Sequence, residues 1–108
     1  MNEKEFYINL GTLFKDRIRL HFEKDKGQIL DLVLQYETLI NTKWVAIVRY
    51  DCAHGFFHRD ILYPNGDKEK KVIDIPNLKY GITFAQQDLE DKWEWYKEQY
   101  LKRIKNDK

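Results

Sequence analysis

Two histidines, two arginines and two aspartates lie close together near the middle of the chain, in the twelve residues from Arg49 to Asp60. Three residues, one of them a glycine, separate His54 from His58. Imidazole gains and loses a proton near neutral pH and binds metal ions, while the planar guanidinium group of arginine matches the geometry of phosphate. Apolar runs flank the segment on both sides. We therefore interpret this segment as the candidate functional site.

The first chemistry that fits the segment is RNA cleavage without a metal ion. That reaction needs a base for the 2′-hydroxyl proton, an acid for the leaving oxygen and a cation for the charged phosphorane. Two histidines supply the acid and the base, an arginine holds the phosphate, and an aspartate orients one imidazole. The residues predicted to be catalytic are His54, His58, Arg59 and Asp51. The residues predicted to bind the substrate are Arg49, Tyr50, Asp60, Arg19 and His21.

The distribution of arginine supports a special role for this residue. The chain has 14 lysines and only 5 arginines, yet Arg49 and Arg59 bracket the two histidines. Arg17 and Arg19 share the face of a predicted strand with His21. In a lysine-rich sequence, arginine at these positions indicates a need for two parallel hydrogen bonds to one anion.

The same segment also fits a metal site or a purely structural role. The potential ligands of zinc or another transition metal are His54, His58, Asp51 and Asp60. We expect no metal or other cofactor, because the neighbouring arginines repel a dication and attract phosphate. In a purely structural role, Asp51 caps a turn, while Arg59 and Asp60 are ordinary surface charges.

Length and composition predict a packed protein without a global electrostatic signature. The 108 residues correspond to one domain over residues 1–108, and an aromatic fraction of 15% is typical of a globular core. A net charge of +1 gives no overall attraction to nucleic acid or membranes. Cys52 is the only cysteine, which excludes a disulfide within the chain. No apolar run approaches the roughly 20 residues of a membrane helix, so we expect a cytoplasmic protein.

Alternating apolar and polar residues predict a β-sheet over residues 5–75 approximately. Leu30, Leu32, Leu34 and Tyr36 recur at every second position, which is typical of a half-buried strand. Lysines flank a last strand through Val72 to Ile75 and discourage pairing at this edge. The strand that contains Leu30 to Tyr36 is predicted over residues 28–40. The other predicted strands are residues 6–10, 17–23, 44–48 and 56–63.

The last third of the chain has the period of an α-helix, predicted over residues 78–105. Apolar residues recur at spacings of three and four from Ile82 to Ile104 and form one stripe. The expected fold is therefore α+β, an antiparallel sheet of four to six strands with one long C-terminal helix packed on one face. Phe84 and Trp95 lie off the main stripe and predict a second apolar patch, of the kind that forms a homodimer interface.

The segment from Trp44 to Asp60 resembles a known sequence pattern. Together with the turn at residues 64–66 and the helix around Trp93, it is similar to a family of small, uncharacterised prokaryotic proteins marked by Arg-Tyr-Asp-x-Ala-His-Gly-x-x-His-Arg-Asp. More loosely, Arg49 to His58 resembles the TumE-like toxins of toxin-antitoxin systems. The first resemblance implies a prokaryotic origin, and the second implies RNA cleavage.

From these observations we predict a toxin-like protein that acts as a metal-independent ribonuclease. Its expected partners are RNA and a small antitoxin protein, with no membrane association. The alternatives are a non-catalytic module that binds a partner protein or nucleic acid, such as an antitoxin or an accessory protein, and a metal-binding protein.

Overall fold

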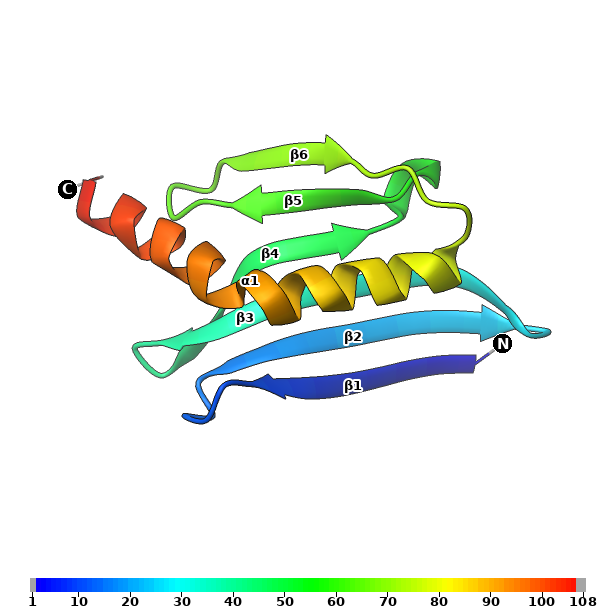
Figure 1. Cartoon of the computed structure of the whole chain (residues 1–108), viewed down its shortest axis with the longest axis horizontal. Helices are drawn as coiled ribbons and strands as arrows, with labels where there is room; N and C mark the ends of the chain where they lie inside the picture. Colours follow the sequence, from blue (N-terminus) through cyan, green and yellow to red (C-terminus); the bar gives the residue numbers. More distant parts are fainter. Residues whose placement is uncertain (1, 107–108) are drawn as a thin grey trace.

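The computed structural model of the chain describes residues 2–106, apart from the side chains of His54 and Asn106. Six antiparallel strands form one open sheet in the order β1-β2-β3-β4-β5-β6, followed by one long helix (Figure 1). The predicted α+β fold is therefore confirmed. The strands are β1 (Asn2–Leu10), β2 (Asp16–Asp25), β3 (Gln28–Ile40), β4 (Lys43–Asp51), β5 (His58–Leu62) and β6 (Lys68–Val72). The helices are the short η1 (Ala53–Gly55) and α1 (Leu78–Asn106).

The strand boundaries differ from the predicted ones at both edges of the sheet. β1 begins at Asn2 and pairs with β2 along its whole length. β6 ends at Val72, so Ile73 and Ile75 lie beyond the last strand. The Ile73 amide still donates to the Phe57 carbonyl at 2.9 Å, and both isoleucines pack against the core. Both isoleucine side chains therefore pack against the core, and the Ile73 backbone continues the hydrogen bonding beyond β6.

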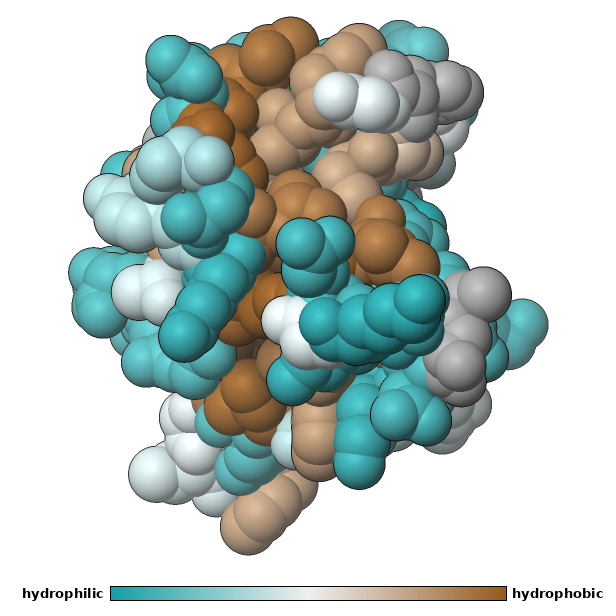
Figure 2. All heavy atoms as spheres, turned by 90° about the vertical axis from the view of Figure 1, so that its right-hand side faces the viewer, coloured by the Kyte–Doolittle hydropathy of each residue, from teal (hydrophilic) through white to brown (hydrophobic). Residues whose placement is uncertain are grey.

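One face of the sheet is covered by α1, and we call the other the open face. Because successive side chains of a strand point to opposite faces, the alternation along the sequence divides the residues between them. Figure 2 views the molecule from the side where α1 begins and shows apolar residues as a band between hydrophilic flanks. The large apolar side chains that are fully buried are Ile18, Leu32, Leu34, Tyr36, Ile47, Val48, Tyr50 and Leu89.

The helix begins where its sequence supplies a cap. Asn77 Oδ1 accepts a hydrogen bond from the Tyr80 amide at 2.8 Å and so satisfies one of the free donors of the first turn. Ala85, Leu89 and Tyr96 form the buried stripe that the periodicity predicts. Among the described residues, no helix combines the length and the apolar character that crossing a membrane requires.

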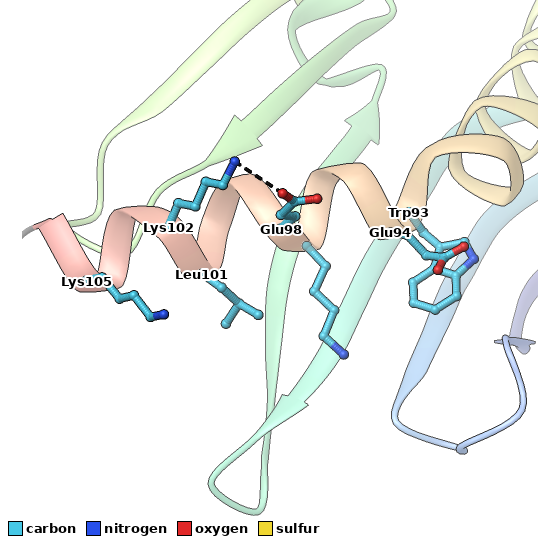
Figure 3. A pocket seen from close by; sticks show the side chains of 7 residues that line it. Trp93, Glu94, Glu98, Leu101, Lys102 and Lys105 are labelled. Carbon is cyan, nitrogen blue, oxygen red and sulfur yellow. Dashed lines mark ion pairs between the residues drawn. The ribbon is translucent and has the colours of Figure 1, made fainter.

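The C-terminal half of α1 is less closely covered than its centre. A hollow of about 510 Å³ lies along this part and is lined by α1 residues alone, among them Trp93 and Leu101 (Figure 3). Leu101 is 38% exposed, whereas Leu89 is fully buried. The helix is therefore buried more completely around Leu89 than around Leu101.

Gly11 provides a test of the packing between the β1-β2 turn and α1. Its φ of +70° is unfavourable for other residues, and an added Cβ would lie 3.0 Å from Cζ2 of Trp93. Gly27 has a similar φ of +80° but open space around it. Gly27→Ala should lower the free energy of unfolding by about 1 kcal/mol, and Gly11→Ala by about 2 to 3 kcal/mol, in urea denaturation. Equal losses would show that Trp93 moves aside without cost.

Candidate functional site

The register of β4 and β5 brings four of the predicted site residues together on the open face. Asp51 lies directly opposite His58, and Arg49 directly opposite Asp60. Directly opposed residues of antiparallel strands have Cβ atoms about 4.5 to 5.5 Å apart, close enough for their side chains to interact. Two residues from each strand thus form one compact group of charged and titratable side chains.

Asp51, His58 and Asp60 form the centre of this group, and we call them the Asp-His-Asp cluster. His58 Nε2 lies 3.0 Å from Asp51 Oδ1 and 3.6 Å from Asp60 Oδ2. His58 is 2% exposed, Asp60 4% and Asp51 7%, although no helix covers this face. The Phe56 ring, 5.6 Å from the imidazole, contributes to this burial. The cluster is therefore largely removed from solvent.

The two nitrogens of the His58 imidazole have different partners. Nδ1 lies 3.3 Å from the Phe56 carbonyl oxygen, which accepts a hydrogen bond but cannot donate one. A proton on Nδ1 would make this contact a hydrogen bond. In that tautomer of the neutral ring Nε2 has a lone pair, and here Nε2 faces two carboxylates. The two carboxylates favour a proton or a metal cation at Nε2.

Arg49 keeps Asp51 in its charged form. Arg49 Nε donates to Asp51 Oδ2 at 2.8 Å, and the Ala53 amide donates to Asp51 Oδ1 at 3.0 Å. Burial by itself would raise the pKa of Asp51, but these hydrogen bonds and the nearby charges outweigh burial and hold the pKa below its usual range. Asp51 is therefore a carboxylate at neutral pH.

Asp60 has an incomplete set of partners. Oδ1 of Asp60 is buried and has no hydrogen-bond partner among the described residues. Its Oδ2 faces His58 and lies 4.0 Å from Lys68 Nζ. Buried carboxylate oxygens normally have partners, because leaving one without them costs about 1 to 3 kcal/mol or more. Asp60 thus retains an unused acceptor beside the imidazole.

The structure separates several of the predicted site residues from this cluster. Tyr50 and Arg59 point to the face that α1 covers, where they contact Asp88 and Tyr96. The side chain of His54, which belongs to η1, lies outside the described part of the structure. The structure therefore does not show the predicted set of two histidines and Arg59 as one site.

Arg19 and His21 lie on β2, on the open face but away from the cluster. Arg19 Nη1 donates to Glu5 at 3.0 Å, and His21 Nε2 lies 3.8 Å from Glu3. A continuous network connects β2 with β4, because Glu37 binds both Arg17 and Gln35, and Gln35 accepts from Arg49 at 3.1 Å. The arginines of this face are therefore engaged with acidic and amide groups.

A second polar cluster, which the sequence did not reveal, lies between the sheet and α1. Asp88 Oδ2 accepts hydrogen bonds from the hydroxyls of Tyr50 at 2.7 Å and Tyr96 at 2.6 Å. Arg59 Nη1 donates to the Tyr96 hydroxyl at 3.4 Å. In the sequence, the position of Asp88 next to Leu89, at the edge of the apolar stripe, was the signal that could have indicated this cluster. The cluster connects β4 and β5 to the helix by hydrogen bonds.

Cys52, which follows Asp51, is not poised for nucleophilic chemistry. Its Sγ donates to Asp31 Oδ1 at 3.3 Å. Burial and this hydrogen bond raise the pKa of Cys52 to about 11, so the residue is a thiol at neutral pH. Since the thiolate is the reactive form, Cys52 is an unreactive residue here.

The fold and the site define an α+β protein with a buried Asp-His-Asp cluster on the uncovered face of a six-stranded sheet. The model of a protein family described as a domain of unknown function (DUF7718) matches residues 1–106. The chain belongs to this family, which confirms the prediction of an uncharacterised family. Searches of curated proteins and of solved structures find no significant match. The sequence motif as a family signature and the resemblance to TumE-like toxins stay predictions.

Proposed function

We propose that the protein binds a divalent transition-metal ion through Asp51, His58 and Asp60. The observation that carries this proposal is the orientation of His58, whose Nδ1 faces a carbonyl while Nε2 faces two carboxylates. Histidine ligands of metals commonly donate their other ring N–H to a carbonyl or a carboxylate, which fixes the ring. One of these carboxylates, that of Asp60, has an Oδ1 without a hydrogen-bond partner among the described residues.

The spacing of the donor atoms suits a metal ion. Ligands about 2.1 Å from a metal are separated by about 3.0 Å at right angles and about 3.4 Å at tetrahedral angles. The distances of 3.0 and 3.6 Å from His58 Nε2 to the two carboxylates are close to these values. One imidazole and two carboxylates favour zinc, iron(II) or manganese over copper(I) or calcium.

The predicted toxin-like ribonuclease is less well supported. Metal-independent RNA cleavage by His58 would require this imidazole to reach the substrate, but its exposed fraction is 2%. Of the two arginines predicted to hold the phosphate, Arg59 points to the opposite face of the sheet and Arg49 is paired with Asp51. Cleavage without a metal stays a prediction, which RNA incubated with EDTA-treated protein tests. RNA decay that survives EDTA and disappears in His58→Ala would favour it over metal binding.

Calorimetric titration of EDTA-treated protein with Zn²⁺ and with Mn²⁺ tests the metal proposal. We expect one ion per chain for at least one of the two metals. Asp60→Asn, which keeps the size of the side chain, and His58→Ala should each weaken binding by about a hundredfold or more. His21→Ala is the matched control, because His21 lies on the same face outside the cluster. It should leave the affinity unchanged.

Nitrogen-15 spectra of the histidine ring separate the two possible species at Nε2. In the metal-bound protein, Nε2 of His58 carries no proton and Nδ1 keeps its own. A wild-type protein that binds neither metal and shows both nitrogens of His58 protonated at neutral pH would contradict the proposal. The cluster would then be an imidazolium between two carboxylates with a structural role.

A further inference from the structure

A groove of about 650 Å³ lies between the C-terminal half of α1 and the strands β5 and β6. We call it the α1 groove. It lies on the face that α1 covers, so the sheet separates it from the Asp-His-Asp cluster. Sites for small molecules usually occupy about 300 to 1,000 Å³ and combine apolar walls with a few polar groups. The α1 groove has this size, and its lining combines cationic and aromatic side chains.

Positive charge dominates the lining of the α1 groove. Arg59, Lys92 and Arg103 contribute three cations, and Glu69 contributes one carboxylate. Lys92 Nζ lies 3.5 Å from Asp88 Oδ1, so the two arginines are the cations left for a ligand. Glu69 accepts a hydrogen bond from the Tyr63 hydroxyl at 2.7 Å and keeps its negative charge. The excess of cations favours an anionic ligand.

Arg59 is the cation that the fold holds most firmly. It is half-buried, and its Nη1 donates to the Tyr96 hydroxyl, which in turn donates to Asp88. Its buried Nε has no hydrogen-bond partner in the described part of the chain. Burial opposes the charge, but Tyr96, Tyr50 and Asp88 outweigh burial and raise the pKa of Arg59. The guanidinium is thus held in place at the wall of the groove, and a fixed guanidinium is well suited to bind phosphate.

Aromatic rings lie beside these cations. Trp95 is 54% exposed and makes an edge contact with Tyr96 at 5.5 Å between ring centroids. The guanidinium of Arg103 lies 3.9 Å from the centre of the Tyr63 ring. Exposed aromatic faces stack on nucleobases with about 1 to 3 kcal/mol per base, and stacked arginines add to such contacts.

From this combination we infer that the α1 groove binds a nucleoside phosphate, either as a free nucleotide or as part of a single-stranded RNA. Arg59 holds the phosphate, with Arg103 at the rim, and the exposed ring of Trp95 stacks on the base. Inorganic phosphate alone lacks the stacking contact and binds more weakly. The inference does not depend on the metal site, because the two sites lie on opposite faces of the sheet.

The three tryptophans provide separate reporters for an NMR titration of the whole chain. AMP, UMP, a short single-stranded RNA and inorganic phosphate are each added to nitrogen-15 labelled protein. The indole N–H signal of Trp95 should shift with AMP, UMP or the RNA and much less with phosphate. The signal of Trp44 should stay in place, because this ring packs against Arg17, which binds Glu37 in the open-face network. A shift with the RNA but not with the free nucleotides identifies the RNA as the source of the ligand.

Substitutions in the groove test the roles of its residues. Arg59→Gln should weaken nucleotide binding by about tenfold or more, because a charge-assisted hydrogen bond to phosphate is lost. Arg103→Gln, at the exposed rim, should produce a smaller loss in the same direction without a risk to folding. Lys4→Gln removes one positive charge on β1, at the opposite edge of the sheet, and should leave the affinity unchanged.

Several results would overturn the inference. One is the absence of any Trp95 shift at millimolar concentrations of all the nucleotide probes, and another is unchanged affinity in both arginine variants. The third comes from sedimentation of Trp95→Ala. If this variant converts a dimer into a monomer and binds nucleotides like the wild type, the exposed tryptophan belongs to a protein interface instead.

Discussion

Leu89→Ala should lower the free energy of unfolding by about 3 to 5 kcal/mol, as buried leucines at well-packed positions do. Leu89 is fully buried at the centre of the apolar stripe, where α1 crosses the sheet. The substitution removes apolar contacts and leaves a cavity that the strands, held by their own hydrogen bonds, cannot fill. For a domain of this size such a loss is a large part of the total stability. Urea denaturation followed by circular dichroism measures the change.

Leu101→Ala is the matched control for this experiment. It removes the same atoms from the same helix, but Leu101 is 38% exposed and lines a hollow that α1 residues alone form. The expected loss is below about 1 kcal/mol. Comparable losses for the two leucines would show that the C-terminal turns of α1 contribute as much to the folded state as its centre does.

Asp88→Ala should have the second-largest effect, a loss of about 2 to 5 kcal/mol. The carboxylate accepts hydrogen bonds from the hydroxyls of Tyr50 and Tyr96, which are both buried. Removing it leaves two buried donors without their acceptor, each at a cost of about 1 to 3 kcal/mol. Asp91→Ala removes an exposed carboxylate three residues away, and its cost should stay below about 0.5 kcal/mol. A small effect of Asp88→Ala would show that water replaces the carboxylate.

The same cluster predicts how stability depends on alkaline pH. Burial and the hydrogen bond to Asp88 raise the pKa values of Tyr50 and Tyr96 above the usual value. Because the unfolded chain ionises near pH 10 and these tyrosines ionise later in the folded protein, their contribution is complete below about pH 10 and is lost as the pH rises further. Asp88→Asn should weaken this dependence in melts between neutral and alkaline pH.

The proposed functions place two kinds of site on the two faces of one sheet. The open face has the Asp-His-Asp cluster, and the other face has the α1 groove beside Arg59. Residues 58 and 59 are neighbours in β5, yet they serve different sites because a strand directs successive side chains to opposite faces. A module with both sites can bind a metal ion and a nucleotide independently. Comparing the affinity of each ligand in the presence of the other measures any coupling between them.

Local patterns in the sequence determined much of the fold. The period of two along residues 28–40 and the apolar stripe of the helix depend on neighbouring residues alone, so the strand β3 and the helix α1 are both confirmed. Alternation along the predicted strand of residues 56–63 also places His58 and Asp60 on one face and Arg59 on the other. This pattern does not predict which element covers each face of the sheet.

Only the tertiary structure decided which chemical groups meet. Asp51 faces His58 because the segment between β4 and β5 sets their register, and a shift of one residue would turn the imidazole to the other face. Asp88 is far along the chain from Tyr50 and joins it only where α1 crosses β4. Register and helix placement are decided by contacts between distant segments, which a local sequence pattern does not encode. The same holds for the burial of His58, which determines whether it serves as an exposed acid-base group or as an enclosed ligand.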